Sequence, residues 1–391
     1  GILYFHTLKI TTIMKLKLFL LSFVFGLVNI STAQETFPSN GVKNNFEEVH
    51  AFINATLVIS PQQTLENGVL IVQGDRIIRA DNDTTLEIPS GAIVHDLQSK
   101  FIYPSFIDLH TSYGIDNEKR SPWKPQPQYQ SNTGSGAGWN QAIRPQTNSK
   151  DLFNINADQS KAFRASGFGT VLTHYNDGIA RGSGLLTTLN DQNENKSVLI
   201  SKASAHYSVN KGSSRQKFPS SLMGTLALIN QTYLDAEWYS QNNIPVYNRS
   251  LEAWNELQDL PQIFEVNDKL DIQRIWKIAD EFEKDYIIIG NGDEYQRTDF
   301  LKESGFAVVV PIDFPSPYDV TLPDAASMVS LEKMKHWEMA PSNPAILVEE
   351  GIFICLSTSD LEKKSDFLTN LRKAVTFGLD KSDALAALTI N

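Results

Sequence analysis

Cysteine is almost absent from this sequence of 391 residues, which contains only Cys355. A single cysteine excludes a disulfide framework within the chain and any zinc or redox motif built on paired cysteines. Basic residues are also few, because 34 Lys and Arg stand against 45 Asp and Glu, for a net charge of −11. Binding to a nucleic-acid backbone needs a basic face. We therefore predict no nucleic-acid partner.

Long apolar runs are scarce as well. Leu18–Val28 is apolar over 11 residues, whereas a membrane-spanning helix needs about 20. Lys15 and Lys17 precede the run and small residues lead to Ala33, which is the pattern of an export signal cleaved after that alanine. The alternative is a buried strand or helix. We expect a soluble protein, exported to the periplasm or the extracellular space, with no membrane span once the signal is removed.

The first part of the chain is therefore set apart from the fold. Residue 1 is glycine and the first methionine is Met14, so residues 1–33 are interpreted as an over-extended start followed by the signal peptide. Residues 34–48 are polar and predict a flexible lead-in. Residues 49–102 contain short strand patterns separated by turn residues, with a hairpin across Gly74-Asp75. This pattern predicts a small β-sandwich that lacks its last strands.

A different pattern begins near residue 103 and continues to residue 391. Apolar runs suited to buried strands alternate with amphipathic helical segments, which predicts a parallel sheet covered on both faces. About eight such strands after a small β-module favour an α/β fold of the TIM-like (β/α)8 barrel type. Residues 113–150 lack any apolar period and predict a long functional or mobile loop.

Functional side chains of such a barrel lie at the carboxyl ends of its strands. Histidines and carboxylates at these ends can supply the three protein ligands of a hydrolytic zinc site, although a lone histidine is more commonly a hydrogen-bonded structural residue. The candidates at the expected strand ends are His110, His174, Lys202, His206, Glu265, Asn267, Asn291, Asp313 and Asp360. Their spacing alone does not single out one ligand set.

Several segments of the chain resemble the amidohydrolase superfamily. Residues 103–112 (YPSFIDLHTS) resemble its PGFIDxHxH motif, residues 166–184 its second strand and loop, and residues 378–389 the helix that closes its barrel. With the strand and hairpin of residues 49–102, the resemblance covers nearly all of residues 49–391. It is closest to the imidazolonepropionase-like branch, and to the first module of long exported bacterial proteins that carry two such modules.

The resemblance implies zinc, and the ligand positions can be transferred one by one. His110 matches the first histidine of the HxH pair, whereas Ser112 replaces the second. Glu265 stands where the fifth strand of the family ends in histidine, and Gly290-Asn291 stand at the end of the sixth. Lys202 loosely matches a lysine that some members carboxylate. The expected metal ligands are therefore His110 and Glu265, a degenerate set with too few donors to retain zinc.

The catalytic aspartate of the family is also displaced. Ser359 takes its place and Asp360 follows one residue later, so Asp360 is the expected general base. The histidines His174 and His206, together with Asn267, are further candidates for the rim of the site. Since the family sequence continues beyond Asn391, we expect this chain to be a fragment of a longer protein, with a second amidohydrolase module as its partner.

Three functions remain open from the sequence. The whole protein is expected to be an exported hydrolase of C–N bonds other than peptide bonds, in a cyclic amide, imide or similar substrate. This segment alone is expected to be a metal-free pseudoenzyme that binds a small molecule or supports the second module. A metal-independent hydrolase using Asp360, His174 or His206 is the third possibility. The sequence identifies neither the substrate nor the oligomeric state.

Overall fold

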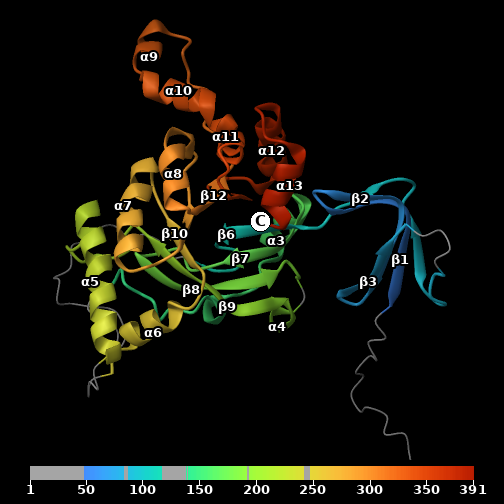
Figure 1. Cartoon of the computed structure of the whole chain (residues 1–391), viewed down its shortest axis with the longest axis horizontal. Helices are drawn as coiled ribbons and strands as arrows, with labels where there is room; N and C mark the ends of the chain where they lie inside the picture. The colour runs from blue at the N-terminus through green and yellow to red at the C-terminus, as the bar shows by residue number, and fades with distance from the viewer. Residues whose placement is uncertain (1–47, 83–86, 117–137, 139, 192, 242–246) are drawn as a thin grey trace, which may run out of the picture.

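The computed structural model describes residues 48–82, 87–116, 138, 140–191, 193–241 and 247–391. The chain forms a small N-terminal sheet beside a larger body of strands and helices (Figure 1). The predicted signal peptide and nearly all of the predicted lead-in lie outside the described residues. Among the residues that are described, no helix combines the length and the apolar character needed to cross a membrane.

The N-terminal part is a single five-stranded sheet. Its strands are β1 (Val49–Ser60), β2 (Gln63–Gln73), β3 (Arg76–Asp81), β4 (Ile93–Asp96) and β5 (Phe101–Ile102). Strands β1, β2 and β3 pair antiparallel in sequence order, and β4 and β5 both pair in parallel with β1. Gly74 has the positive φ of 58° that the predicted hairpin turn requires. The expected β-sandwich is therefore corrected to one sheet, because β4 and β5 extend the first layer instead of starting a second.

The larger body is built on an eight-stranded sheet whose strands follow one another in sequence order. They are β6 (Phe106–Thr111), β7 (Phe168–Thr173), β8 (Ala180–Thr188), β9 (Val198–Ser208), β10 (Gln262–Glu265), β11 (Tyr286–Ile289), β12 (Ala307–Pro311) and β13 (Ile354–Ser357). The edge strands β6 and β13 meet through Asp108, which accepts a hydrogen bond from Ser357 Oγ at 2.7 Å. The α/β barrel predicted from the strand and helix alternation is thus present.

One strand departs from the parallel barrel that the sequence predicts. β8 runs antiparallel to both β7 and β9, whereas the other neighbouring strands of this sheet pair in parallel. A parallel neighbour needs a crossover of a dozen or more residues, but residues 174–179 and 189–197 are shorter than that. β8 also begins at Ala180, so the end of residues 166–184, which the resemblance implies to be a loop, is strand.

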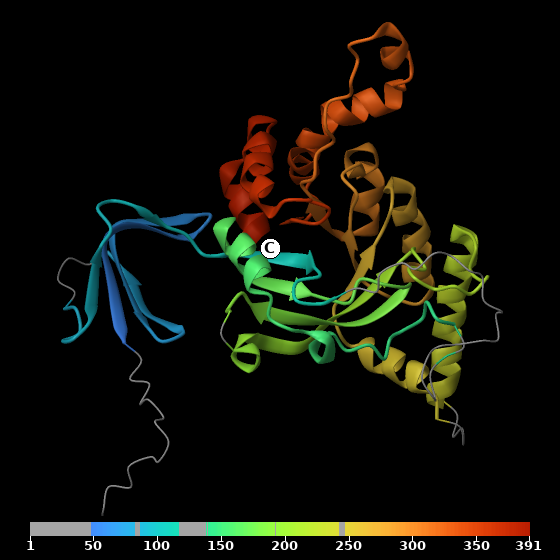
Figure 2. The same ribbon diagram turned by 180° about the vertical axis from the view of Figure 1, so that it is seen from behind.

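Helices cover the outside of this sheet, with α5, α7 and α8 along one side of the body (Figure 1). The first helices are α2 (Ser149–Leu152), α3 (Ala157–Ala165), α4 (Glu194–Ser197), α5 (Leu222–Gln241), α6 (Arg249–Leu257), α7 (Lys269–Glu281) and α8 (Thr298–Ser304). The later ones are α9 (Pro323–Ser327), α10 (Leu331–Met339), α11 (Asn343–Glu349), α12 (Phe367–Thr376) and α13 (Lys381–Thr389), with 3-10 turns η1 (Glu294–Gln296), η2 (Ala340–Ser342) and η3 (Lys364–Asp366). In both overall views α9 and α10 project away from the body (Figure 2).

Helix boundaries follow from the local sequence, as α7 illustrates. The Asp268 side chain caps its first turn by accepting hydrogen bonds from the backbone N–H groups of Leu270 and Asp271. Ile272, Ile275 and Ile278 recur at helical spacing and are buried against the sheet. Burial of each such side chain contributes about 2 kcal/mol to the free energy of folding.

The described end of the predicted long loop is partly ordered against β8. Residues 140–143 are buried, and Ile143 forms a parallel bridge with Ala180. Arg144 N–H donates to the carbonyl of Ala180 at 2.9 Å. These residues extend the sheet beside the first half of β8, while residues 117–137 and 139 lie outside the described part.

Candidate metal centre and pocket

The barrel interior changes from apolar to polar toward the carboxyl ends of the parallel strands. Leu172, Ile263 and Cys355 belong to one buried apolar layer. Because inward-facing positions recur every second residue along a strand, the next inward positions are His174, Glu265 and Ser357. This polar layer holds the histidines predicted from the sequence.

Three histidines meet in this layer. His110 lies on β6, His174 follows β7 and His206 lies on β9. One ring nitrogen from each lies within 4.8 Å of those of the other two. The His174 and His206 rings stack at 3.8 Å with an interplanar angle of 5°, and the His110 ring is 4.6 Å from that of His174. The His110 side chain is 8% exposed and those of His174 and His206 are each 1% exposed, so the cluster is almost closed to solvent.

A glycine on β8 makes room for this cluster. β8 passes between His174 and His206 in the order of the sheet, and its Gly184 has no side chain to occupy the interior. A Cβ at this position would lie 2.5 Å from both His206 Nε2 and Ser204 Oγ. The absence of a side chain at residue 184 therefore allows Ser204 Oγ and His206 Nε2 to form their 2.8 Å hydrogen bond.

Several imidazole nitrogens lack a hydrogen-bond partner. Within the described part of the chain, His110 Nδ1 and both ring nitrogens of His174 are buried without one. Leaving a buried polar group unpaired costs about 1–3 kcal/mol. A metal ion accepts lone pairs from imidazole nitrogens and so offers one way to satisfy them.

The electrostatic surroundings keep two of these rings neutral. Burial is the largest cause that holds the pKa of His174 well below its ordinary value, and His206, His110 and Arg181 act in the same direction. Burial, His110 and Arg181 likewise hold the pKa of His206 well below its ordinary value, against the opposing effect of Glu265. Neutral imidazole is the form that binds metals. His174 and His206 are therefore available as donors at neutral pH.

Arg181 is the functional residue that the sequence prediction missed. It is 4% exposed and lies at the start of β8, in the segment expected to be a loop. Its Nη1 donates to Glu265 Oε2 at 2.6 Å and its Nη2 to Glu265 Oε1 at 3.3 Å. Burial alone would raise the pKa of Glu265, but the Arg181 charge and the hydrogen bond from His110 hold it well below its ordinary value. Glu265 is therefore ionised.

The donor set fits a metal, although the rings must move to hold one. Tetrahedral zinc with nitrogen ligands at 2.0–2.1 Å places those nitrogens about 3.3 Å apart. Here the ring nitrogens of the three histidines lie within 4.8 Å of one another, which is a looser arrangement. Nearly parallel stacked rings also keep their in-plane lone pairs in two separate, nearly parallel planes, so the lone pairs do not converge on one point. One of His174 and His206 would have to turn before both could bind the same ion.

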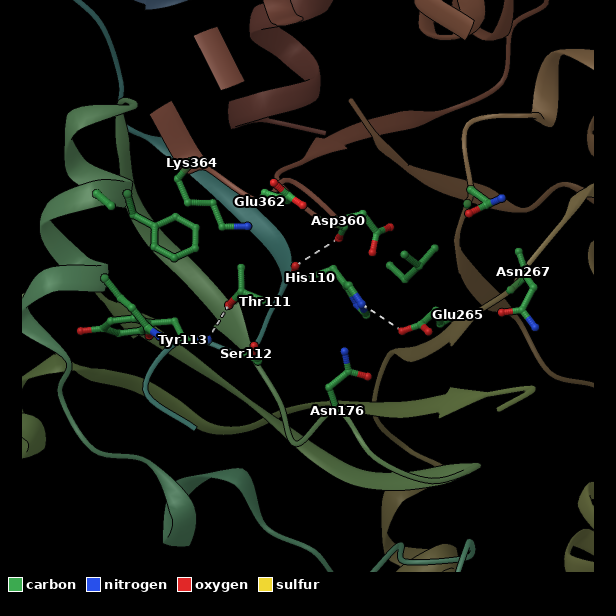
Figure 3. A pocket seen from close by; sticks show the side chains of 18 residues that line it. His110, Thr111, Ser112, Tyr113, Asn176, Glu265, Asn267, Asp360, Glu362 and Lys364 are labelled. Atoms are coloured by element: carbon green, nitrogen blue, oxygen red, sulfur yellow. Dashed lines mark hydrogen bonds and ion pairs between the residues drawn. The ribbon is translucent and has the colours of Figure 1, made fainter. Parts of the chain in front are cut away.

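A cavity of about 440 Å³ opens next to His110 (Figure 3). His110 lines this cavity and links it to the buried histidines. The other lining side chains are mainly polar: Ser112, Gln159, Asn176, Glu265, Asn267, Asn291, Ser359, Asp360, Glu362 and Lys364. Figure 3 shows that the His110 ring faces Glu265, and His110 Nε2 lies 3.2 Å from Glu265 Oε2. The cavity thus suits a small polar molecule.

Asp360 lines this cavity in an unusual backbone conformation. Its φ is 62°, in the left-handed region that costs a residue other than glycine about 1–2 kcal/mol. Ser359 packs inward, where its hydroxyl donates to the His110 carbonyl at 3.3 Å. The strained turn after β13 therefore brings the carboxylate of Asp360 to the cavity, which Ser359 also lines.

The predicted site residues fall into two groups. His110, Glu265, Asn267 and Asp360 line one cavity, and Asn267 is held there by paired amide hydrogen bonds with Asn210 at 2.8 and 3.3 Å. His174 and His206 lie next to His110 in the interior.

One sequence expectation needs correction. Lys202 does not end a strand at the site, because β9 continues to Ser208 and the lysine pairs with Glu256 at 3.2 Å on a half-exposed surface. Among the described residues, the histidine cluster that can hold a metal does not include Glu265. Its carboxylate pairs with Arg181 and His110 instead.

Comparison with known proteins supports the fold. No family model and no curated protein matches the chain. Among solved structures, an amidohydrolase from Thermotoga maritima MSB8 aligns over 87% of this chain and 86% of its own, with a TM-score of 0.67 and 19% identity. A prolidase complexed with N-methylphosphonate-L-proline aligns over 87% of this chain and 86% of its own at 13% identity, with a TM-score of 0.49. The chain therefore shares the fold of the first protein.

Proposed function

We propose that this chain is a metal-dependent hydrolase of the amidohydrolase type, acting on C–N bonds other than peptide bonds in a cyclic amide-like substrate. One observation carries the proposal: three buried histidines, with unpaired nitrogens on His110 and His174, adjoin a polar cavity in an amidohydrolase-like fold. His110, His174 and His206 would hold the ion. Bound zinc supplies a Lewis acid and lowers the pKa of water, which is the chemistry that such hydrolysis needs.

Side chains of the cavity account for the remaining tasks. The carboxylate of Asp360 lines the cavity, and in this proposal it accepts a proton from water and returns it to the leaving nitrogen. The amides of Asn176, Asn267 and Asn291 offer hydrogen-bond donors and acceptors to a polar substrate. Lys364 donates to the Thr358 carbonyl at 2.7 Å, which holds its ammonium group at one side of the cavity.

Metal analysis of the purified chain tests the proposal directly. After incubation with zinc and removal of free metal, we expect about one zinc per chain, and hydrolysis of at least one member of a cyclic amide and imide panel. His174→Ala should abolish both. His50→Ala, in the N-terminal sheet, is the matched control and should change neither. Failure of the folded wild-type chain to bind zinc, nickel, cobalt or manganese would contradict the proposal.

A second candidate is a metal-free barrel that binds a small molecule, the degenerate state expected from the sequence. It is favoured because side chains of the site already interact with one another. Arg181 forms an ion pair with Glu265, and Ser204 Oγ is hydrogen-bonded to His206 Nε2. The stacked rings of His174 and His206 fit this candidate as well. If the barrel is metal-free, compounds of the same amide panel would bind the cavity with the same affinity before and after treatment of the protein with a chelator. Calorimetry would measure both affinities.

We also propose export of the protein, based on the sequence between Lys15 and Ala33. N-terminal sequencing of the secreted product should then begin at or near Gln34. The expected second amidohydrolase module is likewise a proposal, which the coding sequence beyond residue 391 tests.

A further inference from the structure

A second cavity, of about 820 Å³, adjoins the first near the carboxyl ends of β9 and β10. Asn267 lines both cavities, and in the view of Figure 3 it lies on the side of Glu265 away from His110. Its paired amide hydrogen bonds with Asn210, which lines the second cavity, fix its side chain at the junction. The two cavities therefore meet at Asn267.

Two lysines bring positive charge to the second cavity. Lys211 and Lys217 both line it. Lys211 Nζ donates to the backbone carbonyl of Gln216 at 3.0 Å, and within the described part of the chain neither lysine forms an ion pair with a carboxylate. Since the whole chain has a net charge of −11, two lysines without acidic partners on one cavity wall are a local exception.

The two acidic residues of the same cavity already have partners. Asp268 caps α7 and accepts hydrogen bonds from the N–H groups of Leu270 and Asp271, at 2.7 and 3.1 Å. Asp271 is 2% exposed, and its carboxylate accepts from Arg274 Nη1 at 2.7 Å and from the N–H of Asn267 at 3.2 Å. The lysines are therefore the charged groups of this cavity that remain for a ligand, and the ligand that they attract is an anion.

The loop that carries the lysines is fixed to the wall of the first cavity. Ser213 lies between them in the sequence, and its N–H and its hydroxyl each donate to the Asp177 carboxylate at 2.6 Å. Asp177 also pairs with Arg144 at 3.1 Å, and it directly follows Asn176, which lines the first cavity. The loop backbone is thus held in place before a ligand binds, which lowers the entropic cost of binding.

We propose that the second cavity binds the anionic end of the substrate, and that Lys211 and Lys217 select cyclic amide-like compounds that carry a carboxylate or phosphate group. The ring would occupy the cavity beside His110 and Asp360, with the anionic group beyond Asn267. A lysine ammonium group attracts either anion as a point charge. The choice of substrate rests on the proposed function, whereas binding of the anion to this cavity does not.

Calorimetry with three matched probes tests the subsite without added metal. The probes are N-(3-carboxypropyl)succinimide, its phosphonate analogue and its neutral primary amide. We expect the two anions to bind about 5–10-fold more tightly than the amide at low salt, with a smaller difference at high salt. The double variant Lys211→Met, Lys217→Met should lose this preference and keep its affinity for the amide. Lys196→Met with Lys277→Met makes the same change of charge at exposed positions outside the cavity and should retain the preference.

Circular dichroism checks the folding of both double variants. Equal affinity of the wild-type chain for all three probes, or a preference that the folded Lys211→Met, Lys217→Met variant keeps, would overturn the anionic subsite. A preference for only one of the two anions would assign the subsite to that anion. A lysine-dependent preference without hydrolysis by the zinc-loaded chain would overturn the proposed function and leave the subsite standing. Hydrolysis of all three probes with equal kcat/KM would overturn the substrate class alone.

Discussion

Thr358 donates both its backbone N–H and its hydroxyl to one carboxylate oxygen of Asp108, at 3.0 and 2.6 Å, across 250 residues of sequence. Asp108 is fully buried, and its other oxygen accepts from Ser357 Oγ and from the N–H of His110. The carboxylate thus joins the first and last strands of the barrel beside the histidine cluster.

Asp108→Ala should destabilise the chain by about 3 kcal/mol or more, because it leaves several buried donors without an acceptor. Urea unfolding followed by fluorescence measures the change. Asp75→Asn, in the exposed hairpin turn of the N-terminal sheet, is the control and should stay within about 0.5 kcal/mol. Equal stability of the two variants would show that Asp108 does not join the barrel edges.

Gly184→Ala should disturb the histidine cluster. The added methyl group would lie 2.5 Å from His206 Nε2, and such overpacking costs about 1–3 kcal/mol. In Gly224→Ala the nearest atom would be at 3.3 Å, so this variant should change stability by less than about 1 kcal/mol. Thermal unfolding compares the stabilities of the two variants, and zinc affinity should fall only in Gly184→Ala.

Zinc should stabilise the folded chain. A ligand at 100 times its dissociation constant adds about 2.7 kcal/mol to the free energy of unfolding when it binds only the native state. We therefore expect zinc to raise the midpoint of thermal unfolding and EDTA to reverse the rise. His206→Ala should remove the shift, because a three-nitrogen site would become a two-nitrogen site. An equal shift in that variant would place the zinc elsewhere.

Asp360→Gly should separate stability from function. Glycine adopts positive φ without strain, so the substitution should stabilise the chain by about 1 kcal/mol while removing the proposed general base. Asp360→Asn keeps the side-chain volume and should lose hydrolysis with little gain in stability. Denaturant unfolding and turnover of the amide panel are measured on both. Full turnover by either variant would exclude Asp360 from catalysis.

Cys355 should react slowly with thiol reagents in the native state. Burial raises its pKa to about 11, whereas an unfolded chain has a thiol pKa of about 8.5. Because the folded pKa is the higher, the thiol favours the unfolded state as pH rises through this interval, and stability should decline between those two values. Labelling with a disulfide reagent in native buffer and in urea measures the difference. Equally fast labelling of Cys355 in native buffer and in urea at pH 8 would contradict the burial of its thiol.

The sequence predicts the fold well where its signal is local. Alternation of apolar strands with capped helices identifies the α/β barrel, and the strand-end positions identify His110, His174 and Glu265 as parts of one polar region. It does not predict which histidines meet, because that depends on packing between strands. The resemblance directs attention to Ser112 and Glu265, whereas the cluster draws its other members from His174 and His206.

Arg181 escapes prediction for a related reason. Its segment is rich in glycine, which favours a loop, although small residues such as Gly184 are what allow a strand to pass beside large side chains. One signal was available in the sequence. The connections on either side are too short for the crossover that parallel strands require, so β8 could have been predicted as antiparallel.

The reversed direction of β8 also has a consequence for how the site can change over evolution. The connection of residues 174–179 turns back at the carboxyl ends of the parallel strands, so its two ends deliver His174 and Arg181 to the same layer. A neutral donor and a permanent cation are thus encoded within eight consecutive positions. Insertions in this short hairpin would separate them, whereas the long segments after β6 and β12 can vary in length around it. Under the proposed function, substrate preference is therefore free to diverge through those segments while the hairpin is inherited as one unit.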